Sequence, residues 1–194
     1  PGKLSKRDGD RLGFPVFPID WSNDETGETA SGYREFGFFP GAFINMLALL
    51  GWNPGTEQEI FDLKGLVDAF DLSKVSKSGA KFDFEKGKWF NQLYLRDLSE
   101  AELAHELKNV LDNEGLSYNE AHLGTIATMM SERATFPQDL LEEGRFLFET
   151  PTEYDEKTRA KKWNEESAPM MKDLAARFNA LPDFTSDAIE ACFK

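Results

Sequence analysis

Cysteine and histidine are scarce in this sequence. It contains one cysteine, Cys192, and two histidines, His105 and His122. A single cysteine excludes a disulfide within the chain, and three such side chains are too few for a structural zinc site with four nitrogen or sulfur ligands. We therefore expect no metal site and a reducing, cytoplasmic environment.

A long apolar run is also absent. Residues 36–56 carry no charge and are nominally long enough to cross a bilayer, but prolines and asparagines interrupt them and leave an apolar core over 43–52. We expect a buried helix there and no membrane partner. The chain does not open on a basic region followed by an apolar stretch, so nothing in it resembles a secretion signal.

Basic side chains are in the minority. The sequence has 22 Lys and Arg against 35 Asp and Glu, a formal net charge of −13. Taken alone, this balance argues against a nucleic-acid binder, which usually has a basic patch or a high pI. The charge is uneven, however, because residues 74–88 hold five lysines against two acidic residues, whereas 97–120 hold seven acidic residues against one lysine.

What the sequence has in abundance is helical periodicity. Residues 1–32 are rich in Gly, Pro and Asp and predict loops with short extended pieces. Ser99 and Glu102 form a predicted capping box, and Asp83 is a plausible cap of another helix. The fold class we expect is mainly α, because apolar residues recur at helical spacing along most of the chain. The stretches with this spacing are 41–51, 59–70, 85–95, 103–111, 120–133, 137–148, a segment that ends at residue 163, 169–178 and 189–193.

A cationic cluster stands near the first residue. Lys3-Leu4-Ser5-Lys6-Arg7 is flanked by glycines, and a flexible loop of this kind could bring movable ammonium groups onto a polyphosphate. The alternative is a solvated basic tail, which is the more frequent meaning of such a cluster.

Several longer stretches then follow in a fixed order. Together with the cationic cluster, they resemble bacterial glutamyl-tRNA synthetase from its "KMSKS" signature onward. The resemblance is firm from residue 3 to about residue 96 and looser to the end, and residues 11–30 look like an insertion into the family pattern. The stretches that carry it are Phe39–Trp52, Phe82–Lys86, Trp89-Phe90-Asn91 and Tyr94.

The resemblance implies a class I synthetase that activates glutamate with ATP and transfers it to tRNA(Glu). By position, Lys6 would be the catalytic lysine, and Lys3, Ser5 and Arg7 would help it hold the ATP phosphates, with Mg in the full-length enzyme. The family's nucleotide-binding half precedes this loop. We therefore expect the present chain to be inactive alone, to hold no cofactor, and to meet ATP and glutamate only together with that half.

The resemblance also implies two regions. Residues 1–96 would be the lysine loop plus a stem-contact domain, and residues 97–194 an all-helical anticodon-binding region whose last part is missing. We expect a monomer. Whether tRNA(Gln) is charged as well stays open. The residues we expect to contact tRNA are Lys77, Lys81, Lys86, Lys88 and Arg133.

Each of these tRNA contacts has a structural alternative. Arg133 could be an ordinary helix-surface residue with an ion-pair partner one turn away. Trp89, Tyr94 and Trp163 could stack on bases, but aromatic residues at helical spacing usually pack in a core. The basic residues over 157–162 fit a solvated, charge-laced helix as well as an RNA contact.

The competing interpretation of the whole chain is a catalytically silent helical interaction module. Its acidic faces would then keep it dispersed or bind a basic protein. Binding of tRNA at two salt concentrations would distinguish the two interpretations.

Overall fold

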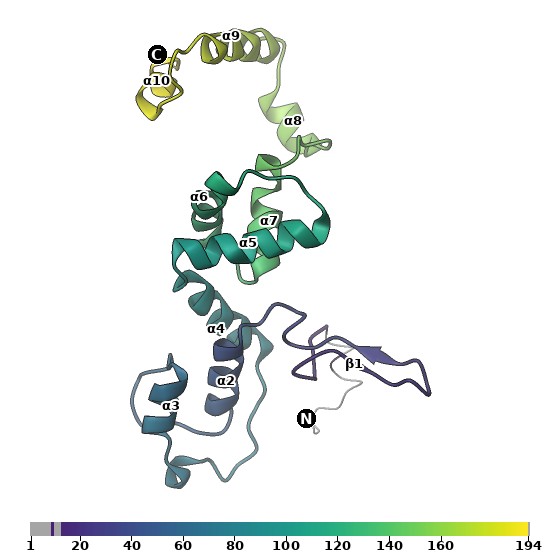
Figure 1. Cartoon of the computed structure of the whole chain (residues 1–194), viewed down its shortest axis with the longest axis vertical. Coiled ribbons are helices and arrows are strands. Elements are labelled where there is room, and N and C mark those ends of the chain that lie inside the picture. The colour runs from purple at the N-terminus through teal and green to yellow at the C-terminus, as the bar shows by residue number, and fades with distance from the viewer. Residues whose placement is uncertain (1–8, 10–12, 194) are drawn as a thin grey trace. The chain divides into compact units, whose positions relative to one another are not determined.

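The computed structural model describes residue 9 and residues 13–193, and it divides into two compact units, residues 1–149 and 150–194 (Figure 1). The first unit contains β1 (Trp21–Ser22), β2 (Thr29–Ala30), α2 (Pro40–Leu49), α3 (Leu63–Ala69), η1 (Leu72–Lys74), α4 (Phe84–Arg96), α5 (Glu100–Glu114), α6 (Glu120–Ser131), α7 (Pro137–Gly144) and η2 (Arg145–Leu147). The second contains α8 (Glu156–Lys162), α9 (Ser167–Asn179) and α10 (Ser186–Ala191). The expected mainly α fold is confirmed.

The uncharged stretch over 36–56 contains the short helix α2, as expected, but this helix is buried on one side only, because Ile44 and Leu47 are 40% and 47% exposed. Pro40 opens it at a position where a missing N–H leaves nothing unsatisfied. α2 packs on α4 so closely that a Cβ at Gly87 would lie 2.6 Å from the sulfur of Met46. Within the described part of the chain, no helix combines the length and the apolar content that crossing a membrane requires.

An aromatic core lies where α2 and α4 meet the preceding loop. Its ring contacts include Phe36 with Phe136 at 5.2 Å and Phe38 with Phe136 at 5.1 Å between centroids. Phe136, which directly precedes α7, therefore packs in the aromatic core formed with α2 and α4. The buried members are Tyr33, Phe38, Ala42, Met46, Phe90 and Phe136.

A second, aliphatic core lies among α5, α6 and α7, which pack side by side in Figure 1. The predicted capping box starts α5: the Ser99 side chain accepts from the Glu102 N–H, and the Glu102 carboxylate accepts from the Ser99 N–H at 2.8 Å. Gly115 ends α5 with φ 68°. The buried residues are Leu95, Leu103, Leu107, Leu111, Leu123, Ala127, Met130, Ala134, Leu140 and Leu141.

Two predicted helices are shorter than their apolar pattern. The stripe over 59–70 becomes helical only at Leu63, because the Asn45 amide donates to the Glu59 carbonyl at 2.7 Å and accepts from the Phe61 N–H at 2.8 Å. These bonds hold the stretch before α3 in an extended form. The stripe over 137–148 is α-helical to Gly144 and continues as the 3-10 turn η2.

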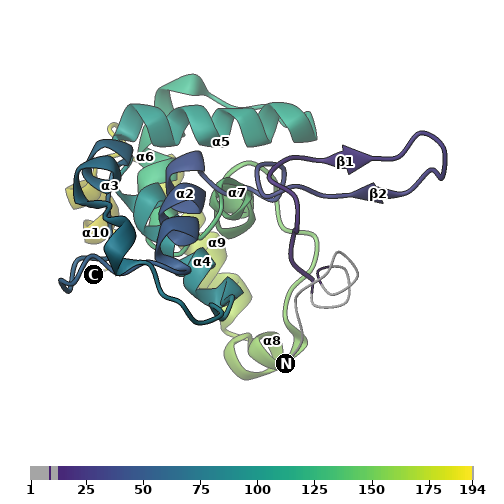
Figure 2. The same cartoon turned by 90° about the horizontal axis from the view of Figure 1, so that it is seen from below.

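The early loops contain a small hairpin. β1 and β2 pair antiparallel, with Trp21 opposite Ala30, and Figure 2 shows the hairpin extending away from the helices of its unit. At its tip the Asn23 side chain accepts from the N–H groups of Glu25 and Thr26 at 2.9 and 3.2 Å. These bonds close the turn at the acidic tip of the apparent insertion.

The second unit has a small apolar centre of its own. The Phe178 ring on α9 lies 5.8 Å from the rings of both Phe184 and Phe193. Cys192, directly after α10, donates its thiol to the Ala188 carbonyl at 3.4 Å. No residue of α8 is buried.

Candidate nucleic-acid interface

The predicted phosphate-binding loop lies outside the described residues. Lys3, Ser5, Lys6 and Arg7 are all among residues 1–8, so the catalytic and ATP-contacting roles stay predictions. Within the described part of the chain there is no group of three or more His, Cys, Asp or Glu side chains that could hold a metal ion.

The lysine-rich stretch over 74–88 begins with a structural lysine. Lys74 donates to the Pro54 carbonyl at 2.6 Å, next to the single bridge that pairs Val75 with Trp52. The Ser76 N–H then donates to the Gly51 carbonyl at 2.7 Å. Lys74 therefore fastens this stretch to the loop after α2 and has little freedom to bind a ligand.

Two of the predicted tRNA contacts form ion pairs within the protein. The Lys86 ammonium pairs with Glu59 and lies 5.7 Å from the centre of the Phe90 ring. The Lys88 ammonium pairs with Glu85 at 2.8 Å and lies 5.5 Å from the centre of the Phe84 ring. A phosphate at either lysine would have to compete with a carboxylate that is already in place.

Lys77 and Lys81 differ from these two. Both are exposed, and neither forms an ion pair with any residue that the structure describes. An exposed and unpaired ammonium can approach a phosphate without first breaking an internal contact. Lys77 and Lys81 are therefore the stronger phosphate-binding candidates of the four predicted lysines.

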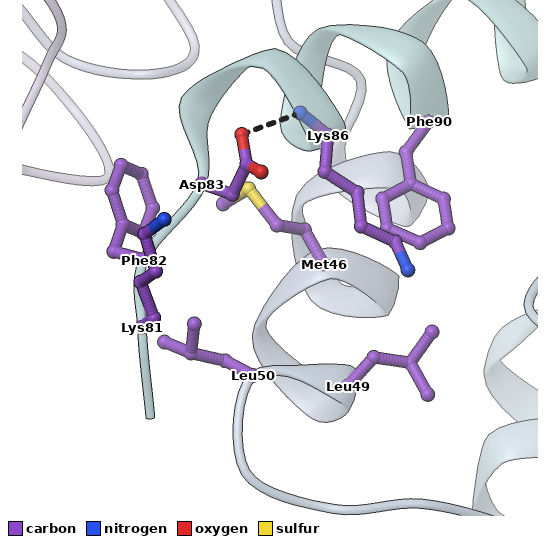
Figure 3. Close-up of a pocket in the computed structure, with 8 residues that line it drawn as sticks. All are labelled: Met46, Leu49, Leu50, Lys81, Phe82, Asp83, Lys86 and Phe90. Atoms are coloured by element: carbon purple, nitrogen blue, oxygen red, sulfur yellow. Dashed lines mark hydrogen bonds between the residues drawn. The ribbon is translucent and has the colours of Figure 1, made fainter. Parts of the chain in front are cut away.

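Lys81 borders a hollow between α2 and the start of α4 (Figure 3). Figure 3 shows the ammonium groups of Lys81 and Lys86 on opposite sides of the Met46 side chain. The Asp83 carboxylate accepts from the Lys86 backbone N–H at 3.1 Å. The hollow measures about 90 Å³. Ligand pockets usually have roughly 300–1,000 Å³, so this site can contact a phosphate at the surface but cannot enclose a base.

Arg133 follows α6 and is largely exposed. Its side chain is 72% accessible, and Nη1 lies 3.8 Å from a carboxylate oxygen of Glu143 on α7. The partner is thus on another helix and not one turn away on the same one. Such a long and exposed pair contributes little stability, so the guanidinium can exchange this carboxylate for another acceptor.

The three aromatic candidates separate clearly. The Tyr94 hydroxyl donates to the Phe61 carbonyl at 2.5 Å. Burial, followed by the charges of Asp62 and Asp97, raises the pKa of Tyr94. Tyr94 is therefore a core residue. Trp89 is 39% exposed and lies against Phe90 at 5.0 Å. Trp163 is 52% exposed and follows α8 directly.

Asn91 is a positioning residue that sequence reasoning overlooked. Its fully buried side chain accepts from the Phe39 N–H at 2.8 Å and donates to the carbonyls of Gly37 and Thr135 at 3.1 and 2.7 Å. It therefore joins the loop before α2 to the loop before α7. The available signal was the spacing of Asn91, which stands four positions before the apolar Leu95 and therefore on the same face of the predicted helix.

Known proteins match this arrangement along the whole chain. Residues 95–194 match the family described as "Anticodon binding domain", and residues 23–89 match "tRNA synthetases class I (E and Q), catalytic domain". Glutamate–tRNA ligase of Phocaeicola vulgatus is 53% identical over 190 residues, which cover 98% of this chain and 38% of that relative. The ligase of Parabacteroides distasonis is 49% identical over 189 residues, 97% of this chain and 37% of that relative.

A solved structure agrees with these sequence matches. A crystal structure of a glutamate tRNA ligase from Elizabethkingia meningosepticum, in complex with its amino acid, matches with a TM-score of 0.93 and 44% identity over 99% of this chain and 38% of that one. The chain thus spans about 38% of the length of these relatives. These matches favour a tRNA ligase over the alternative of a catalytically silent interaction module, which is set aside.

Proposed function

The chain belongs to the glutamate–tRNA ligase family, and from this premise we propose that its residues bind tRNA for an enzyme that joins glutamate to tRNA(Glu). The observation that carries the proposal is the collinear match of the chain to a class I catalytic family and then to an anticodon-binding family. We place the protein in the cytoplasm as a monomer.

The proposed division of labour follows the sequence. Residues 1–96 carry the lysine loop and contact the stem of the tRNA, and residues 97–194 bind the anticodon region. α4 joins the two proposed parts, because it contributes Phe90 to the aromatic core and Leu95 to the aliphatic core. Asn91, between them, holds loops from both sides of the proposed boundary.

The chemistry of the complete ligase is proposed from the family alone. Glutamate would be activated with ATP and Mg, with Lys6 as the catalytic lysine and Lys3, Ser5 and Arg7 around the phosphates. A fixed positive charge at the phosphates stabilises the charge that develops as pyrophosphate leaves. By itself, the present chain is proposed to bind tRNA without aminoacylating it.

The test is direct binding of labelled tRNA(Glu) to this chain by fluorescence anisotropy at several KCl concentrations. We expect binding that weakens steeply with salt, because each phosphate contact contributes roughly 0.7 to 0.9 to the slope of log K against log salt. Undetectable binding at the lowest salt would overturn the proposed function.

A matched pair of variants then locates the contact. Lys77→Ala combined with Lys81→Ala should make the salt dependence shallower, because both side chains are exposed and unpaired among the described residues. Lys64→Ala combined with Lys172→Ala removes the same charge from α3 and α9 and should leave the slope unchanged. Equal effects of the two pairs would contradict the assignment of Lys77 and Lys81.

A further inference from the structure

One face of α8 gathers residues of a particular kind. Thr158, Arg159 and Lys162 follow Asp155 at intervals of three, four and seven positions, and such positions lie on the same side of a helix. Lys157 and Lys161 are also four positions apart, but they lie on the opposite side. The cations of α8 thus form two pairs that face in different directions.

The first of these faces borders a large hollow. It measures about 600 Å³ and is lined by Tyr154, Asp155, Thr158, Arg159, Lys162 and Trp163. This volume lies within the range of roughly 300–1,000 Å³ that ligand pockets occupy, unlike the hollow beside Lys81. Tyr154 and Trp163, which stand before and after α8 in the sequence, are 67% and 52% exposed.

The charges of this face are available to a ligand. Neither Arg159 nor Lys162 forms an ion pair with any residue that the structure describes, in contrast to Lys86 and Lys88. The Asp155 carboxylate accepts from the Thr158 N–H at 2.7 Å, and the Thr158 side chain, followed by this backbone bond, lowers the pKa of Asp155. Asp155 is therefore engaged as the cap of α8, which leaves two free cations on the face.

We propose that this face of α8 binds an unpaired nucleotide of single-stranded RNA. Trp163 stacks on the base, while Arg159 and Lys162 contact the neighbouring phosphates. The proposal rests on the proposed function, since it assigns part of the tRNA contact to α8. Aromatic side chains stack on bases that are splayed out of a helix, whereas a duplex hides the faces of its bases, so an unpaired part of the tRNA fits this face. Among the unpaired parts we choose the anticodon loop, because α8 lies within the residues that match an anticodon-binding family.

The charge contribution is tested with the two cation pairs of the same helix. Arg159→Ala with Lys162→Ala should lower the slope of log K against log salt by about 1.4, which is 0.7 for each lost contact to a single strand. Lys157→Ala with Lys161→Ala removes the same charge from the opposite side and should change the slope little. The probe is the isolated anticodon stem-loop of tRNA(Glu), bound to the full 194-residue chain.

The stacking contribution is tested at Trp163. Trp163→Ala should weaken binding of the stem-loop by about 5-fold to 100-fold, and Trp163→Phe, which keeps a ring, should retain most of the affinity. A fluorescent adenine analogue in the loop should be quenched on binding to the wild-type and Phe variants and not to the Ala variant. No residue of α8 is buried, so circular dichroism should show all variants folded.

The outcomes separate this inference from the proposed function. Equal slopes for the two cation pairs, or equal binding of the Ala and Phe variants, would overturn the site on α8 while wild-type binding of tRNA(Glu) still supports the proposed function. Equal binding of a blunt duplex and of the stem-loop would also overturn it. Absence of any wild-type binding to tRNA(Glu) would overturn both.

Discussion

Glu102 links the stability of a helix to pH through one side chain. Bonds from the Ser99 hydroxyl and the Ser99 N–H lower the pKa of its carboxyl below the ordinary value of 4.5. A lowered folded-state pKa means that the carboxylate stabilises the folded protein above the unfolded-state pKa. This contribution is lost as the pH falls through the folded-state pKa.

The capping box gives the first prediction. Ser99→Ala should lower the free energy of unfolding by about 1 kcal/mol at neutral pH, because the first turn of α5 loses its side-chain cap. The difference from wild type should shrink as the pH falls below the ordinary pKa of Glu102. Urea unfolding followed by circular dichroism at neutral and acidic pH measures both effects. Ser117→Ala, at an exposed position after α5, is the control and should show neither.

Lys6 gives a kinetic prediction for a complete ligase that carries this sequence. Lys6→Ala should slow adenylate formation by about 10²- to 10³-fold, the usual loss when one fixed charge contact to the transition state is removed. ATP–pyrophosphate exchange measures this step. Lys64→Ala is the control, because Lys64 is exposed and pairs with Asp68 at 2.6 Å on α3. An unchanged exchange rate in Lys6→Ala would reject the catalytic assignment.

At the scale of the helix, the end of α5 depends on one backbone conformation. Gly115 has φ 68°, and its N–H reaches the carbonyl of Asp112 at 3.2 Å, while the Leu116 N–H reaches that of Leu111 at 3.0 Å. A Cβ at Gly115 would meet no atom within 4 Å, so a substitution is disfavoured by the backbone alone. The left-handed conformation costs a residue other than glycine about 1–2 kcal/mol.

Gly115→Ala should therefore lower the free energy of unfolding by about 1 kcal/mol. Gly79→Ala is a matched control, because its Cβ would also meet nothing within 4 Å and its backbone lacks the left-handed conformation. Urea unfolding measures the free energy of unfolding of both variants. Equal values would show that the backbone at the end of α5 changes conformation without loss of stability.

Sequence patterns located the helices well and their ends less well. α4 and α5 start where Asp83 and Ser99 predicted, because their caps are local in sequence. The start of α3 was wrong by several residues, because the Asn45 side chain, which lies on another helix, determines it. Periodicity detects an apolar face but cannot show that a distant amide occupies the backbone groups a helix would need.

The candidate interface also depends on contacts between residues that are distant in the sequence. The sequence identified the lysines over 74–88, but whether each ammonium is free depends on contacts such as Lys86 with Glu59, far apart in the chain. The basic residues over 157–162 fit either a solvated helix or an RNA contact by sequence alone. Their spacing of three and four positions could have separated the two faces of α8, whereas the hollow beside one face could not be predicted.

For the molecule as a whole, the compact unit of residues 1–149 crosses the proposed boundary between residues 96 and 97. Asn91 joins the two sides through the carbonyls of Gly37 and Thr135, and Gln138 on α7 donates to the Phe36 carbonyl at 2.9 Å. The stem-contacting and anticodon-binding parts that we propose are therefore expected to unfold together as far as residue 149.

Asn91→Ala should lower the free energy of unfolding of this unit by about 3 kcal/mol, because it leaves three part-buried backbone groups without their partner. Asn109→Ala, at an exposed position on α5, should be nearly neutral. Hydrogen exchange checks the coupling: protection should fall in α2 and in α7 together. A loss confined to one of these helices would show that the two sides unfold independently.

The single thiol of the chain has a practical consequence for experiments. Cys192 lies directly after α10, in the same unit as Trp163, and it is only partly buried. A maleimide-coupled acceptor dye would attach there alone, so energy transfer from Trp163, isolated by comparison with Trp163→Phe, would report a distance inside residues 150–194. The chain thus carries its own donor and labelling site for measuring this distance in the free protein.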